Sequence, residues 1–165
     1  MSVTEPAPDL PDWMRSLAPF TSARLVLVGI GRHDSGDDAL GPLVVSLLRG
    51  RTSLALFDAG TAPENFVGPI VRARPDLILL VDAVHFSAPP GSIRLLGPSE
   101  LDETDFTTHA MSPRLVLDFL LERTGAQSRV LAVQPQTSGP GLLLSEPVRE
   151  AARSIADFLA RTFPA

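Results

Sequence analysis

Three residues have side chains that bind divalent transition metals and stand next to predicted secondary-structure elements. Asp38 lies in a loop between an apolar strand and a helix, Asp82 ends the apolar run LILLVD, and His109 comes just before a helix that starts near Pro113. Two carboxylates and one imidazole can hold such a metal and leave positions open for water or a substrate. The chain contains no cysteine, so a metal site here must use oxygen and imidazole ligands.

Each of these residues also has a structural explanation. Asp37 and Asp38 precede the helix that begins at ALGPL, where carboxylates commonly cap the first turn and complement its dipole. Asp82 follows an apolar run, and a hydrogen bond to a neighbouring loop would offset the cost of its burial. His109, taken alone, is more readily explained as a structural or solvated histidine. Two carboxylates also form an acid and base pair without a metal, which leaves His109 without a role.

The sequence gives less support to a nucleotide-binding site or a serine hydrolase site. The segment GIGRHDSGDD is glycine-rich and follows a strand, but it is neither GxGxxG nor a lysine-containing phosphate loop, so the pattern is weak for nucleotide binding. The chain has no GxSxG elbow, and Ser35 and Ser112 lack a recognisable triad context. Serine hydrolase chemistry is therefore unsupported.

Apolar strands alternate with amphipathic helices along the chain. This alternation predicts an α/β fold with three layers, in which a mostly parallel twisted sheet of about five strands is flanked by helices. Ligands bind such sheets at the carboxyl ends of the strands, where Asp38 and Asp82 are expected. The first predicted strand starts at Arg24, and the others cover residues 54–60, 77–84, 92–97 and 129–135. The short strand 92–97 is bracketed by prolines and is expected at an edge of the sheet.

Length, charge and hydrophobicity limit the domain organisation, the partners and the location that the sequence predicts. A chain of 165 residues is the size of one domain, and we expect a proline-rich N-terminal arm over 1–21, with a short turn at Trp13, Met14 and Leu17, followed by a domain over 22–165. The net charge of −5, without a basic run, argues against nucleic acid and anionic membranes as partners. No apolar stretch is long enough to cross a membrane, so the sequence predicts a cytoplasmic protein, and we expect a monomer.

Several ordered segments resemble one known family. VLVGIGRHDSGDDALGPLVV, DAGTAPENFVGPIVRARPDLILLVDAVHFSAPPGSIRLL and TTHAMSPRLVLDFLLE, with a VQP element after the next strand, are similar to the NiFe hydrogenase maturation proteases. The branch that processes the large subunit of hydrogenase 3 is the most similar. The resemblance runs from about Leu25 to the C-terminal helix, and it identifies 22–165 as a maturation peptidase domain of the phosphorylase/hydrolase-like fold.

This resemblance implies an activity and a site. Family members cut a C-terminal extension from the large-subunit precursor of a NiFe hydrogenase after nickel insertion. Carried over by position, the family's metal ligands are Asp38, Asp82 and His109, which would contact nickel supplied by the substrate rather than held at rest. Asp37 matches the acidic neighbour of the first ligand and is a second-rank site residue. His85 is a further second-rank candidate, although an ordinary loop histidine is the favoured interpretation.

Two positions depart from the family pattern. Arg32 stands where the family usually has asparagine in GxGN, and Ala39 stands where many members have glycine. Arginine offers donors and a charge but no acceptor, so we expect the first loop to be held differently. Two other functions stay open at this point, a metal-dependent hydrolase of another substrate and a non-catalytic binding protein for a metallated partner, since a fold does not fix a function.

Overall fold

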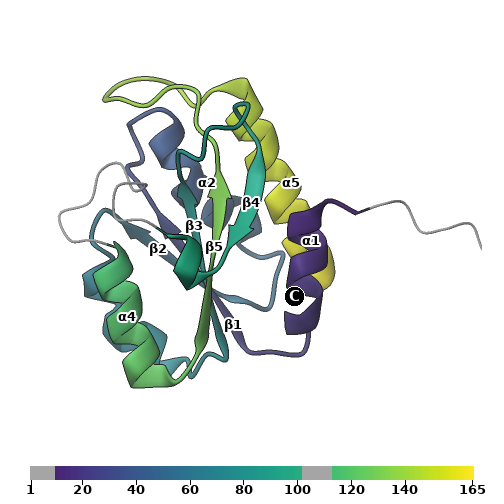
Figure 1. The fold of residues 1–165 in the computed structure, drawn as a ribbon, viewed down its shortest axis with the longest axis vertical. Helices are drawn as coiled ribbons and strands as arrows, with labels where there is room; N and C mark the ends of the chain where they lie inside the picture. The colour runs from purple at the N-terminus through teal and green to yellow at the C-terminus, as the bar shows by residue number, and fades with distance from the viewer. Residues whose placement is uncertain (1–9, 102–112) are drawn as a thin grey trace, which may run out of the picture.

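Five strands form one sheet in the order β2-β1-β3-β5-β4. The computed structural model describes residues 10–101 and 113–165. The strands β1 (Leu25–Ile30), β2 (Ala55–Gly60), β3 (Leu77–Ala83) and β5 (Gln127–Val133) are parallel, and the short β4 (Ile93–Leu96) runs antiparallel to β5 at the edge. The prediction of a mostly parallel sheet with strand 92–97 at its edge is confirmed. In Figure 1 the carboxyl ends of the parallel strands lie at the top.

The two central strands β1 and β3 are buried along their whole length. A parallel strand covered on both faces needs apolar side chains on both faces, which explains the uninterrupted runs LVLVGI and LILLV. The starts of these strands are tied together by Arg24 and Asp76, because the Arg24 backbone N–H donates to Asp76 Oδ2 at 2.8 Å. This backbone hydrogen bond is the main cause that lowers the pKa of Asp76.

Helices cover both faces of the sheet. On one face lie α2 (Leu40–Leu48) and α5 (Glu146–Thr162), whose apolar side chains pack on alternate residues of β1, β3 and β5. On the other face lie the 3₁₀ turn η3 (Pro63–Phe66), α3 (Val67–Arg72) and α4 (Pro113–Thr124). These elements pack on the strand residues that alternate with those under α2 and α5. Figure 1 shows α4 and α5 on opposite sides of the strands. A further 3₁₀ turn, η4 (Pro98–Glu100), follows β4.

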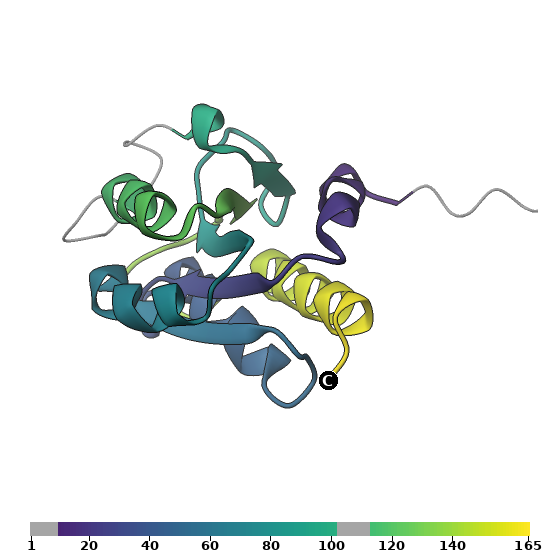
Figure 2. The same ribbon diagram turned by 90° about the horizontal axis from the view of Figure 1, so that it is seen from below.

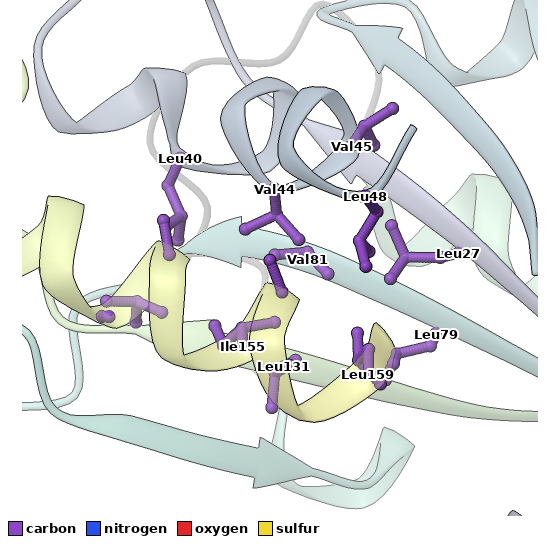
Figure 3. Close-up of a cluster of buried hydrophobic side chains, with 14 of the residues drawn as sticks. Leu27, Leu40, Val44, Val45, Leu48, Leu79, Val81, Leu131, Ile155 and Leu159 are labelled. Atoms are coloured by element: carbon purple, nitrogen blue, oxygen red, sulfur yellow. The ribbon is translucent and has the colours of Figure 1, made fainter. Parts of the chain in front are cut away.

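The larger core lies between the sheet and the helix pair α2 and α5. Figure 3 shows the side chains of α2 directed toward those of α5 and toward the strands below them. These side chains are almost fully buried, and each such leucine or isoleucine contributes roughly 1.5–3 kcal/mol relative to its exposed state. The labelled residues are Leu40, Val44, Val45 and Leu48 of α2, Ile155 and Leu159 of α5, and Leu27, Leu79, Val81 and Leu131 of the strands.

The N-terminal segment contributes to this core. The predicted turn at Trp13, Met14 and Leu17 is the helix α1 (Asp12–Leu17), followed by the turn η1 (Ala18–Phe20). Trp13 and Leu17 are buried, and the Trp13 ring meets the Phe158 ring edge-on at a centroid distance of 5.2 Å. Figure 2 shows α1 beside α5. Residues 12–20 of the expected arm therefore pack on the body, while residues 1–9 lie outside the described part, and the boundary at residue 21 stays a prediction.

Glycines set how closely α2 approaches the sheet. A Cβ atom on Gly41 would lie 2.6 Å from the Val81 carbonyl oxygen and closer still to the Ile30 backbone. Gly29 faces Gly41 from β1 with the same lack of space. Only glycine therefore lets the first turn of α2 touch both β1 and β3, and this contact fixes the height at which Asp38 stands above the strands.

Among residues 10–101 and 113–165, no helix combines the length and apolar character needed to span a membrane.

Candidate active site

The structure brings Asp38 and Asp82 to the same edge of the sheet. Asp38 lies in the 3₁₀ turn η2 (Asp37–Ala39) after β1, and Asp82 is the second-last residue of β3. The strands β1 and β3 are neighbours, and η2 contacts β3. Both carboxylates are buried, with 5% and 3% of their residue surface exposed. Buried carboxylates are stable only when they are hydrogen-bonded, protonated or bound to a cation, so this pair is suited to metal or proton chemistry.

Strand geometry indicates the face on which Asp82 stands. Leu80 belongs to the core under α4, whereas Val81 belongs to the core under α2 and α5. Because side chains alternate along a strand, Asp82 is directed to the face that α4 covers. His109 precedes α4 in the sequence but lies outside the described residues. Within residues 10–101 and 113–165, no group of three or more acidic, histidine or cysteine side chains forms a metal site. The role of His109 as a ligand stays a prediction.

Asp37 joins the β1–α2 loop (residues 31–39) to the β5–α5 loop (residues 134–145). Its carboxylate accepts hydrogen bonds from the backbone N–H groups of Gln136 at 2.7 Å, Thr137 at 2.8 Å and Ser145 at 2.7 Å. The Ser145 hydroxyl also lies 2.9 Å from both carboxylate oxygens. The side chain is fully buried. Asp37 thus anchors a distant loop rather than capping its own helix, and its second-rank role as a ligand stays a prediction.

Backbone contacts complete this junction. Gly36 N–H donates to the Leu142 carbonyl at 3.0 Å, and Gly141 N–H donates to the Asp34 carbonyl at 2.8 Å. Arg32, in contrast, is exposed, and no contact of its side chain appears in the described part of the chain. In this chain the first loop is held by Asp37 and the loop backbone, and the expected difference from other family members stays a prediction.

Gln134 of the VQP element holds the loop that follows β3. Its side-chain oxygen accepts hydrogen bonds from Phe86 N–H at 2.8 Å and Ala88 N–H at 3.4 Å. Its Nε2 atom lies 3.3 Å from Nδ1 of His85. His85 itself is exposed, as expected for a loop histidine, and its role as an accessory ligand stays a prediction. This loop-holding role of Gln134 was not predicted from the sequence, although the VQP element was noted after a buried strand.

A second histidine lies near the same edge. His33 Nε2 is 2.9 Å from Asp58 Oδ2, which joins the β1–α2 loop to the end of β2. The His33 side chain is 66% exposed, so this contact adds little to stability. Sequence reasoning treated His33 only as part of a glycine-rich loop, because no spacing pattern connects it to Asp58.

Comparisons with known proteins agree with this fold. The profile of the hydrogenase maturation protease family matches residues 43–161. The hydrogenase 3 maturation protease of Escherichia coli K12 is 32% identical over 133 residues, which is 79% of this chain and 85% of that protein. The crystal structure of the maturation protease HycI from Thermococcus kodakarensis superposes with a TM-score of 0.78 at 32% identity, covering 87% of this chain and 94% of the other.

Two further solved structures extend the comparison. The solution structure of the E. coli endopeptidase HycI has a TM-score of 0.75 and 30% identity, covering 83% of this chain and 89% of that one. The E. coli endopeptidase HybD, at 22% identity and a TM-score of 0.63 over 81% of this chain and 88% of that one, shares the fold.

The molecule is thus an α/β enzyme with two buried carboxylates, Asp38 and Asp82, at the carboxyl edge of its sheet. The chain belongs to the hydrogenase maturation protease family and is an endopeptidase of hydrogenase maturation.

The anchoring role of Asp37 predicts a loss of stability when its carboxylate is removed. Asp37→Ala leaves the backbone N–H groups of Gln136, Thr137 and Ser145 without their acceptor, and we expect a cost of about 3 kcal/mol, because hydrogen bonds to charged groups contribute roughly 1.5–3 kcal/mol each and are not additive. Urea unfolding measures this loss, and hydrogen exchange at these three amides should accelerate.

Asp34→Ala is the matched control, because Asp34 is exposed in the same loop and contributes to the junction through its backbone carbonyl. Equal stability of the two variants would contradict the anchoring role.

Proposed function

We propose that this endopeptidase removes a C-terminal extension from the nickel-loaded precursor of a NiFe hydrogenase large subunit, with Asp38, Asp82 and His109 contacting the nickel. One observation supports the proposal. In this member of the maturation protease family, two buried carboxylates lie at the same edge of the sheet, Asp38 after β1 and Asp82 near the end of the neighbouring β3. The proposal takes the enzyme to act as a monomer in the cytoplasm.

The donor chemistry fits a metal that arrives with the substrate. Two carboxylates and an imidazole suit a divalent transition metal, and the cysteine-free chain supplies no thiolate that would compete for nickel already held by the precursor. In this scheme the nickel is part of the substrate, and the three side chains recognise it. Nickel bound there supplies Lewis-acid character, which polarises a carbonyl or makes a bound water more acidic.

The fold of the protein fixes the positions of Asp38 and Asp82. Asp82 stands on a buried strand, and Asp38 is fixed between the Gly41 contact on one side and the Asp37 anchor on the other. Such fixed side chains hold a peptide bond and the metal in one arrangement, which removes much of the entropy cost of the reaction. A carboxylate in this position is also able to accept a proton from the attacking water.

Nickel dependence is the first test of the proposal. Purified protein is mixed with large-subunit precursor in its nickel-loaded and nickel-free forms, and shortening of the precursor is followed on a gel. We expect cleavage of the loaded form only, because the three side chains contact the metal. Equal cleavage of both forms would reject nickel recognition, and cleavage of neither would reject the large subunit as substrate.

Substitution of the three proposed nickel contacts is the second test. We expect Asp38→Asn, Asp82→Asn and His109→Ala to slow cleavage by at least about 100-fold, since each removes a group that contacts the metal or the reacting water. Circular dichroism should show an unchanged fold. Asp34→Asn, an exposed carboxylate of the same loop, should cleave at the normal rate. Normal cleavage by all three site variants would show that the site lies elsewhere.

A further inference from the structure

A groove of about 400 Å³ extends along α2. Its lining starts at Ala39, the residue after Asp38, and includes Arg49 directly after the end of α2. A helix rises 1.5 Å per residue, so these two positions lie about 15 Å apart along the axis. An extended peptide covers that length with about four or five residues. The groove therefore has the length of a short peptide segment, and one of its lining residues is the sequence neighbour of Asp38.

One side of the groove is apolar. Ala39, Pro42 and Leu43 line it from η2 and α2, and Leu144 lines it from the β5–α5 loop. On the same loop, Leu142 and Leu143 are 50% and 86% exposed. The loop is held in place by Asp37 and by its backbone bonds to residues 34–37, so these leucines are presented on a fixed support. Exposed leucines on a fixed support are typical of a surface that binds a partner.

The charges in the groove favour an acidic occupant. Asp58 is paired with His33, and it is the one acidic side chain of the lining. The other charged lining residues are Arg49 and Arg149. The Arg49 guanidinium has no ion pair within the described residues, and Arg149 Nε lies 3.9 Å from an exposed Glu146 carboxylate, a contact of little strength. A cationic groove in a chain of net charge −5 is a local feature that complements carboxylates.

We propose that this groove binds the segment of the precursor that follows the cut, as an extended chain, and that Arg49 and Arg149 bind carboxylates of that C-terminal extension. The inference rests on the proposed function, since it assigns the part of the substrate that leaves after cleavage. It makes the two arginines substrate-binding residues that act outside the proposed nickel contacts.

The kinetic test compares KM with kcat in the cleavage of nickel-loaded precursor. We expect the double variant Arg49→Gln with Arg149→Gln to raise KM at least about tenfold, because two charge-assisted contacts are lost, while kcat changes less than about twofold. Arg153→Gln is the matched control, since Arg153 is exposed one turn further along α5 and does not line the groove. An unchanged KM in the double variant would overturn the inference.

A binding test separates the groove from the chemistry. The probe is a labelled synthetic peptide with the sequence of the extension, and its fluorescence anisotropy is measured with the wild type, the double variant and Arg153→Gln. We expect binding to the wild type and the control, weaker binding to the double variant, and weaker binding by a peptide whose carboxylates are all converted to amides.

Equal binding of both peptides, or equal binding to all three proteins, would overturn the assignment of the groove. The proposed function fails separately, when wild-type protein leaves the nickel-loaded precursor intact while still binding the peptide through the arginines.

Discussion

The carboxylate of Asp37 holds the site together. Three backbone N–H groups and one hydroxyl from residues 136–145 converge on it, and each lies within 2.9 Å of an oxygen. Its burial is tolerated because both oxygens are fully used. The same contacts connect the loop that follows the first strand to the loop that follows the last parallel strand. The edge of the sheet thereby becomes one rigid unit, with Asp38 as the next residue along the chain.

The position of Asp38 depends on this anchor and on the close packing beneath it. Gly41 lets α2 start directly over β1 and β3, so the turn that carries Asp38 touches the strand that carries Asp82. The large core between α2, α5 and the sheet then fixes the helix along its length (Figure 3). Two buried carboxylates are thus held at one edge of the sheet by the packing of the whole domain. Placing a charged site on rigid elements is how a fold orients a metal and a peptide bond.

Much of this arrangement could be predicted from the sequence. Continuous apolar runs indicated β1 and β3, helical spacing indicated α2 and α5, and prolines around residues 92–97 indicated an edge strand. The placement of Asp38 and Asp82 at one edge followed from the parallel order of the strands. The role of Asp37 could not be predicted, because its partners lie 99 to 108 residues further along the chain. Contacts between residues distant in sequence also hid the role of Gln134, whose partners lie 46 to 49 residues away, and the pairing of His33 with Asp58. His109 lies outside the described residues.

In the proposed function, the metal belongs to the substrate and not to the enzyme. Its most direct test starts with protein that has been stripped of metal by a chelator, freed of the chelator, and shown by elemental analysis to contain no nickel. Nickel-loaded precursor is then added in metal-free buffer, and the initial rate of cleavage is compared with that of untreated protein. We expect equal rates. Loss of activity after stripping, with recovery when nickel is returned to the enzyme before the precursor is added, would contradict it.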